Sequence, residues 1–320
     1  MRAPTLTILR SLPMRRLQPA VSPLPEKTRF DRELTAELDA LRSQGQIGLP
    51  QKLDAAITTH KKIASDFLRN IISDKNDVDR VAVDKYLEDN VEILDVCNYF
   101  VDKMGHINEY VDLLRVVLHL AERGGSGAAT RALELLDSCQ GFAKRCANME
   151  KNRSSCLKKM LRQKLCHIEG DKLSEVMCGS KAMALMCCRF LELGLSFDTK
   201  HGLPLMKLSQ PASSCSWMRL LEELAKEEDE KKKMKNQRRR CWSELQQTVT
   251  AARELRKQMK GKKEKETKYA VEGLKMSCKE LEHGVEIVEE RVKILYKSLI
   301  DVRMSLLGIL SQPTTVFRSD

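Results

Sequence analysis

The C-terminal part of the chain carries an apolar stripe that constrains the fold more than any other feature of the sequence. Between residues 271 and 309, apolar side chains recur at alternating spacings of three and four without a break. Apolar neighbours such as Ile287 and Ile294 widen the stripe beyond the seam of a two-stranded coiled coil. The pattern therefore favours a long helix packed in a multi-helix bundle over a free coiled-coil dimer. The stripe comprises Val271, Leu274, Cys278, Leu281, Val285, Val288, Val292, Leu295, Leu299, Val302, Leu306 and Ile309.

The placement of proline extends this expectation to most of the chain. Five of the nine prolines lie within the first 25 residues, and the ranges 51–203 and 212–312 contain none. A proline inside a helix costs about 3 kcal/mol, so long ranges without proline are what continuous helices require. The sequence also lacks the Asn-Gly and Asp-Gly pairs that are typical of tight β-hairpins. We therefore predict an all-α fold, an elongated multi-helix bundle with long antiparallel helices and a disordered N-terminal leader.

Helical periodicity also predicts the elements of the N-terminal half. Apolar residues from Leu87 to Ala121 follow one another at helical spacings, which predicts a single helix of roughly ten turns. The glycine cluster at 124–127 is expected to connect this helix to another helical region over 128–170. Near the start, Asp31 is expected to cap the first helix, and His60 is expected to be a hydrogen-bonded core histidine.

The most apolar window, residues 176–195, has the length of a membrane span. Lys181, Arg189 and Glu192 lie within it, however. A charge near the centre of a bilayer costs about 2.5–3.5 kcal/mol, whereas a Leu or Val returns only about 0.3–0.6 kcal/mol. We therefore predict a buried or docking helix for this window.

Pro204 and Pro211 bracket a linker and suggest how the chain is organised. We expect a disordered Arg/Pro-rich leader over 1–28, an N-terminal helical bundle portion over 29–203, and a long C-terminal helical hairpin over 212–312 that packs on the same bundle. The leader has no acidic residue in its first 25 positions, which is typical of a transit peptide, and a merely disordered tail is the alternative. The expected location is the cytoplasm or the periphery of endomembranes, with the plastid as the destination that a transit peptide would specify.

Neither metal nor catalytic chemistry is expected. The eleven cysteines are odd in number and lack the close pairing of zinc ligands, so we interpret them as reduced thiols that pack as small apolar side chains. The sequence contains no H-E-x-x-H, G-x-S-x-G, Walker A or dinucleotide-binding motif. Glu280 and His283 have E-x-x-H spacing, but the second copy that a di-iron bundle needs is missing. We predict a protein that is not an enzyme, with no cofactor and no small-molecule substrate.

A basic segment near residue 235 is the candidate contact site. Its charged side chains could meet an acidic protein partner or an anionic membrane surface, and the alternative is a solvated helix face. Nucleic acid is not expected, because Trp242 is the only aromatic residue beside the segment and no reading motif is present. We define the basic ridge as Lys231, Lys232, Lys233, Lys235, Arg238, Arg239 and Arg240.

Three segments resemble the plant BYPASS family. Residues 30–34 (FDREL) resemble its FDRxL opening, residues 94–98 (LDVCN) resemble its L-L-D-x-C-N segment, and residues 280–288 (ELEHGVEIV) resemble its E-L-x-x-G-[IV]-[ED]-[LI]-V pattern. The three matches occur in the right order from about residue 28 to the end. The Arg- and Pro-rich leader and the very basic 226–268 region depart from the family pattern.

The resemblance implies a non-enzymatic regulator of root and shoot development. Members of this family restrain production of a root-derived mobile signal, related to carotenoids, that arrests shoot growth. The alternative function is a peripheral membrane scaffold, associated with anionic membranes or exocytosis, in which the 176–195 helix and the basic segments would seat the protein on a bilayer. The identity of the protein partner is left open.

Overall fold

The computed structural model describes residues 28–43, 49–73, 80–165, 172–197, 203–208, 215–233, 244–261 and 264–311, with the side chains of 66–73, 172–173, 207–208, 228–233 and 309 excluded. Within these residues the chain forms nine helices and two very short strands. In order they are α1 (Arg29–Ser43), α2 (Leu49–Ser73), α3 (Arg80–Arg123), α4 (Ser126–Arg153), α5 (Ser155–Arg162), β1 (Lys164–Leu165), α6 (Lys172–Gly194), β2 (Lys207–Leu208), α7 (Ser216–Lys233), α8 (Glu244–Lys260) and α9 (Glu264–Leu310).

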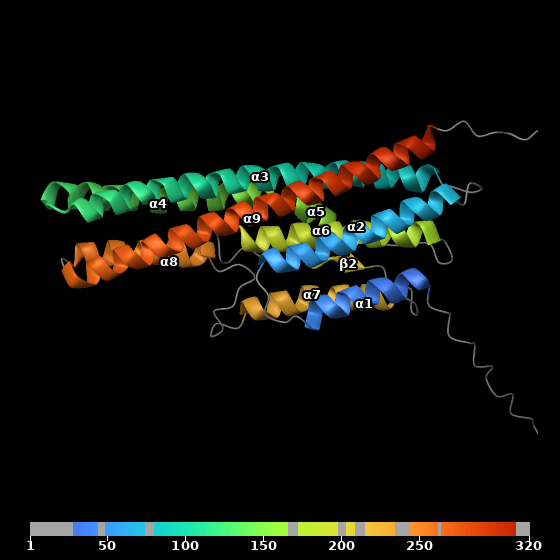
Figure 1. Cartoon of the computed structure of the whole chain (residues 1–320), viewed down its shortest axis with the longest axis horizontal. Helices are drawn as coiled ribbons and strands as arrows, with labels where there is room; N and C mark the ends of the chain where they lie inside the picture. Colours follow the sequence, from blue (N-terminus) through green and yellow to red (C-terminus); the bar gives the residue numbers. More distant parts are fainter. Residues whose placement is uncertain are drawn as a thin grey trace, which may run out of the picture.

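Two long helices form the frame of the bundle. Helix α3 has 44 residues and α9 has 47, so each spans roughly 65–70 Å. Contacts near both ends show that they run antiparallel: Asn90 donates to the carbonyl of Leu299, whereas Lys275 pairs with Glu122. Figure 1 shows α9 crossing the molecule beside α3, with α4 and α8 covering one end. The elongated all-α bundle with long antiparallel helices is therefore confirmed.

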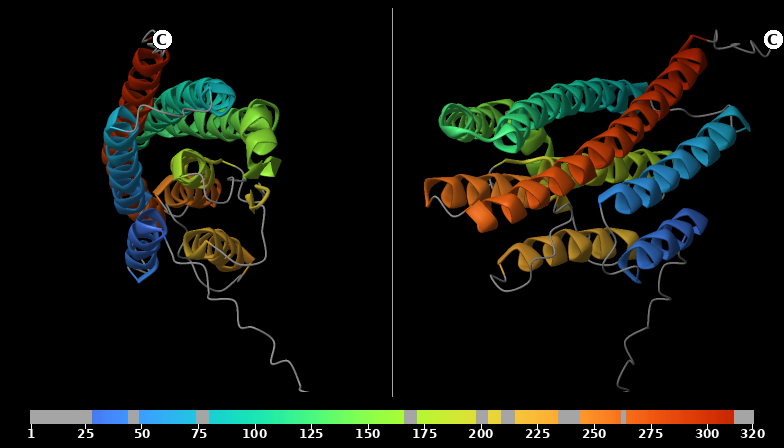
Figure 2. Two further views of the ribbon diagram at one scale, coloured as in Figure 1. Left: turned by 90° about the vertical axis from the view of Figure 1, so that its right-hand side faces the viewer. Right: turned by 60° about the vertical axis from the view of Figure 1, so that its left-hand side comes forward.

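Helix α6 forms the interior of the bundle. It packs against α2, α3 and α5, and Figure 2 shows it enclosed by the other helices. Every residue from Ala182 to Glu192 is buried, including the two charged side chains of Arg189 and Glu192. The most apolar window of the sequence is thus a core helix, and among the described residues no helix is long and apolar enough to cross a membrane.

Helices α1 and α7 lie side by side as a further layer (Figure 1). Phe30 of α1 meets Trp217 of α7 edge-on, with ring centroids 6.3 Å apart. The same phenyl ring packs on Gly179 of α6, where a Cβ would lie 2.5 Å from Cζ of Phe30. A larger residue at position 179 would therefore force the Phe30 ring to move.

The prediction that Asp31 caps the first helix is wrong. Thr28 Oγ1 accepts the backbone N–H of Asp31 at 2.9 Å, so Thr28 caps α1. Asp31 is buried and instead accepts the backbone N–H of Trp217 at 3.3 Å, at the start of α7. Its carboxylate therefore serves the N-terminus of a helix that lies far away in the sequence, which local pattern alone does not reveal.

Two further expectations are corrected. Residues 128–170 are not helical throughout, because α5 ends at Arg162 and Lys164–Leu165 pairs in parallel with Lys207–Leu208. On α3, Val91 and Val101 belong to the expected stripe but are exposed. Helix α3 contacts α9, α4, α6 and α5 along its length, so its buried face changes with its neighbour and no single stripe describes it.

The C-terminal stripe and the cysteines match the sequence patterns. From Val271 to Leu306, every stripe residue of α9 is buried, and Ile309 lies outside the described side chains. The glycine connection is also confirmed, since Gly124 and Gly125 take φ values of 69° and 87° between α3 and α4. The cysteines of the described residues are free thiols, most of them buried in the apolar core.

Shortening one stripe residue of α9 should destabilise the bundle strongly. Leu281 is 0% exposed, so Leu281→Ala leaves a cavity and should cost about 2–5 kcal/mol of unfolding free energy in urea denaturation followed by circular dichroism. Met276→Ala on the same helix is the control, because Met276 is 56% exposed and should change stability by less than about 0.5 kcal/mol. Equal losses for the two variants would contradict the assigned packing face of α9.

Candidate functional site

The basic ridge lies at the limit of what the structure describes. Lys231, Lys232 and Lys233 belong to the last turn of α7, and their side chains are not described. The remaining ridge residues, Lys235, Arg238, Arg239 and Arg240, lie outside the described residues altogether. The ridge therefore stays a prediction, and the structure contributes the position of the helix from which it extends.

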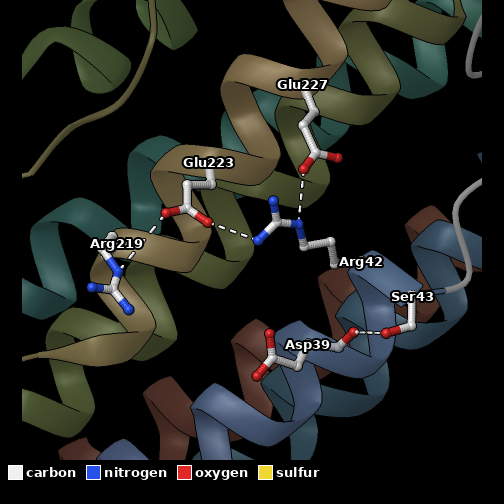
Figure 3. A network of polar contacts seen from close by, with 6 residues as sticks. All are labelled: Asp39, Arg42, Ser43, Arg219, Glu223 and Glu227. Atoms are coloured by element: carbon white, nitrogen blue, oxygen red, sulfur yellow. Dashed lines mark hydrogen bonds and ion pairs between the residues drawn. The ribbon is translucent and has the colours of Figure 1, made fainter.

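Ion pairs attach this helix to α1. Arg42 of α1 donates from Nη1 to Glu223 and from Nε to Glu227, both at 2.8 Å, while Arg219 approaches the other oxygen of Glu223 at 3.8 Å (Figure 3). The side chains are partly exposed, so each pair contributes little to stability, on the order of 1 kcal/mol or less. Their effect is orientational: the acidic face of α7 is directed toward α1.

A second basic region is fully within the described residues. We define the α4–α5 basic surface as Lys144, Arg145, Lys151, Arg153, Lys158, Lys159, Arg162 and Lys164. All of these side chains are exposed except Lys158, which is half-buried. Arg153 pairs with Asp102 at 3.3 Å and Lys159 with Glu92 at 3.4 Å, both acids belonging to α3. The sequence marks this region as basic, but only the fold shows that it faces solvent.

The single acidic residue of this segment points inward. Glu150 is 4% exposed and lies 3.6 Å from Lys103 Nζ of α3. Lys103 is 2% exposed and donates to Glu192 of α6 at 3.0 Å. Glu150 also accepts the Ser196 hydroxyl at 2.8 Å and the backbone N–H of Phe197 at 3.3 Å. This buried ion cluster therefore joins α3, α4 and the end of α6.

Desolvation is the main influence on the pKa values of the groups in and beside this cluster. Burial raises the pKa of Glu150 above its usual range, and the Lys103 ammonium opposes this rise. Burial likewise raises the pKa of Tyr99, whose ring Lys103 faces at 5.5 Å. Next to the cluster is a shallow depression lined in part by His106, Met149 and Arg153, with space for about one water molecule. A depression of this size does not hold a metabolite.

A second buried polar network connects four helices. His60 of α2 is hydrogen-bonded through Nδ1 to Ser298 of α9 at 3.2 Å and through Nε2 to Ser180 of α6 at 3.1 Å. Ser180 in turn is hydrogen-bonded to the Tyr86 hydroxyl of α3 at 2.9 Å. The prediction of a hydrogen-bonded core histidine is confirmed. The burial of the ring lowers the pKa of His60 to about 4, so the imidazole is neutral near pH 7.

These arrangements bind helices to one another and leave little reactive chemistry inside. Within the described ranges, no group of His, Cys, Asp and Glu side chains is arranged to hold a metal ion. Burial raises the pKa of the Cys187 thiol, which keeps it protonated and unreactive. The α4–α5 basic surface, in contrast, is exposed, and we take it as a second candidate contact site.

Sequence reasoning missed the buried ion cluster. Lys103 lies on the same face of α3 as Phe100 and Met104, which are both buried. A lysine at a buried position of a helix was therefore the signal in the sequence that could have predicted the cluster. Lysine is almost never fully buried unless it is paired, which implies a carboxylate on a neighbouring helix. Which carboxylate meets it is decided by the packing of α6 against α3.

Removing the cation of this cluster should be costly. Lys103→Met leaves the buried Glu192 without its ammonium partner, and we expect a loss of about 3–5 kcal/mol in urea denaturation. The double variant Lys103→Met/Glu192→Met should lose less, because neither of these charges then remains in the core. Lys159→Met removes an exposed ion pair and is the control, with an expected change below about 1 kcal/mol. A single Lys103→Met variant as mild as the control would show that the cluster does not hold the helices.

Stability should depend on pH through His60. The ordinary pKa of a histidine is 6.5, and burial lowers that of His60 to about 4 in the folded chain, so the unfolded chain binds more protons between these values. The free energy of unfolding should therefore fall as pH drops from 6.5 to 4, by up to about 3 kcal/mol from this residue. Urea denaturation at a series of pH values measures the slope. His60→Gln should flatten it, whereas His283→Gln, at an exposed position on α9, should not; an unchanged slope in His60→Gln would refute this assignment.

Comparison with known proteins identifies one family. The family model described as Protein BPS1 matches residues 75–309, which include α3 through almost all of α9. No curated protein and no solved structure matches the chain. The matched range contains the buried ion cluster, the α4–α5 basic surface and the C-terminal stripe. The chain therefore belongs to the Protein BPS1 (BYPASS1) family of plant developmental regulators.

Proposed function

We propose that the protein is a non-enzymatic helical regulator that binds a protein partner through its helix surfaces. In this role it restrains production of a root-derived mobile signal, related to carotenoids, that arrests shoot growth. Membership in the BPS1 family supports the developmental role. The proposal includes no cofactor, no small-molecule substrate and no nucleic acid.

One structural observation carries the proposal. Several buried ionisable and hydroxyl side chains of the core are hydrogen-bonded to one another across helices, as Lys103 is to Glu192 and His60 to Ser180. Catalytic groups need access to a substrate, whereas these groups are enclosed and used to hold the bundle together. The outer faces, with strong local charge, are the part of the molecule that is free to act on another protein.

The alternative function, a peripheral membrane scaffold, was based on two features of the sequence, and one of them does not face the surface. It relied on the 176–195 helix, which is buried as α6 and is covered by α2, α3 and α5. The basic segments remain as a means of contact with anionic lipid, at roughly 1 kcal/mol for each basic residue near the bilayer. A cytoplasmic location or one at the periphery of endomembranes accords with either function, and import into the plastid would depend on the leader.

The basic ridge can be tested separately. Replacing its seven residues Lys231, Lys232, Lys233, Lys235, Arg238, Arg239 and Arg240 by Gln should weaken salt-sensitive binding to a partner or to anionic lipid, because the attraction is electrostatic. Flotation with anionic and neutral vesicles, alongside co-purification from plant tissue, measures the two kinds of binding. Thermal denaturation should remain nearly unchanged. Binding at low salt that equals wild type would exclude the ridge.

Reciprocal grafting tests the developmental role. Roots that lack the protein, grafted to wild-type shoots, should arrest shoot growth, and expression of the chain in those roots should restore it. Blocking carotenoid synthesis in the root should also relieve the arrest, since the proposed signal is related to carotenoids. Destabilised Leu281→Ala should fail to restore growth, whereas Met276→Ala should succeed. Failure of the wild-type chain to restore growth would refute the function.

A further inference from the structure

The α4–α5 basic surface has a charge imbalance that the fold itself creates. Residues 144–164 contain eight basic residues and one acidic residue. The acidic residue, Glu150, is turned into the core toward Lys103, so the outer face of this segment carries positive charge only. Two of the cations pair with acids of α3, but Lys144, Lys158, Arg162 and Lys164 have no ion pair with any described residue.

This concentration of charge works against stability of the chain alone. Lys158 and Arg162 lie one turn apart on α5, and like charges at this spacing cost a helix about 0.2–0.5 kcal/mol. The C-terminal turn of α5 offsets part of this cost, since cations are favourable there. Lys151 lies in the last turn of α4 and is favoured there in the same way, whereas Lys144, about two turns earlier, gains no such compensation from a helix end. A negatively charged binding partner would relieve the repulsion.

The uncharged side chains that lie among the basic residues indicate which kind of partner this surface could bind. Asn148 and Asn152 are exposed on the same face of α4 and can donate amide hydrogen bonds to carboxylates. Met149 is 43% exposed and offers an adaptable apolar contact. Residues 144–164 contain no Trp, Tyr or Phe, and the two rings beside them, Phe142 and Tyr99, are half-buried and face Arg145 and Lys103. The surface therefore lacks both the exposed stacking platform of a single-stranded nucleic-acid site and the exposed aromatic anchors of a membrane interface.

The shape of the region points the same way. Helices α4 and α5 meet at Ser154, and α5 turns away from α4 to pack against α3 and α6 (Figure 2). The cations are therefore distributed over α4, α5 and the first residue of β1. A flat bilayer would engage part of this surface, whereas a peptide can follow all of it.

We propose that the α4–α5 basic surface binds an acidic segment of a protein partner, whose glutamates and aspartates pair with Lys144, Lys158, Arg162 and Lys164 while an apolar side chain contacts Met149. This inference rests on the proposed function and names the chemistry of its partner. Arginine and lysine recognise carboxylates by charge-assisted hydrogen bonds, so the interaction weakens with added salt. The site is separate from the basic ridge.

Titration with a defined probe tests the proposal. The probe is a synthetic helical peptide with glutamates on one face and leucines on the other, and its matched control has glutamine in place of glutamate. The full-length chain should bind the glutamate peptide in a salt-sensitive manner and the glutamine peptide much more weakly. The variant K158E/R162E/K164E should weaken binding about tenfold or more, as expected for the loss of three charge contacts.

A matched charge-reversal control separates this surface from net charge. Lys85, Lys279 and Lys297 are exposed on α3 and α9, and K85E/K279E/K297E changes the total charge equally. This variant should bind the glutamate peptide within about twofold of wild type. Equal weakening by both variants, or equal binding of both peptides, would overturn the proposal. Binding to phosphatidylserine vesicles that depends on Lys158, Arg162 and Lys164, without binding to the peptide, would also overturn it and would favour a membrane surface.

Grafting distinguishes failure of this inference from failure of the proposed function. If the wild-type chain restores shoot growth and K158E/R162E/K164E restores it equally, the function stands and the α4–α5 basic surface does not serve it. If the variant folds with wild-type thermal stability and fails to restore growth, while the control variant succeeds, the surface is the one that the regulator uses. Failure of the wild-type chain rejects the function without reference to this surface.

Discussion

The ion pair between Lys103 of α3 and Glu192 of α6 sets the position of the innermost helix. Neither charge can remain in the core without the other, because an unpaired buried charge costs several kcal/mol. The contact of Lys103 with Glu150 and the hydrogen bonds of His60 add polar contacts that a shifted α6 would leave unpaired in the core. The surfaces of the surrounding helices are presented in fixed positions as a result.

Burial of one acidic residue also shapes the exterior. Because Glu150 pairs with Lys103 in the core, the outer face of residues 144–164 keeps its basic residues without an exposed acid of the same segment. At α7 two acids are used in a similar way, since Glu223 and Glu227 pair with Arg42 of α1. In both places acidic residues serve contacts between helices, and at residues 144–164 the basic side chains are left for contact with other molecules. This division suits a regulator that acts by binding.

Helix class and the core face of α9 were predictable because a regular spacing of apolar residues has one physical solution, a helix buried along one side. The burial of the 176–195 window was predictable for a related reason, the cost of its three charges in a bilayer. Prediction failed where a helix changes neighbours, as at Val91 and Val101 of α3, and where a polar group serves a distant element, as Asp31 does for α7. The basic surface on α4 and α5 was visible as composition, but its one-sided charge depended on where Glu150 points.

The sequence by itself determined that this chain forms long helices, that its C-terminal helix buries a continuous stripe, and that it belongs with the BYPASS-like proteins, because these properties reside in local spacing and motif. The tertiary structure alone decided which carboxylate meets Lys103, that Gly179 lies directly beneath the Phe30 ring, and which cations have no ion pair with a described residue. Those outcomes depend on residues far apart in the chain that meet only when helices pack, and periodicity along one helix carries no information about its partner.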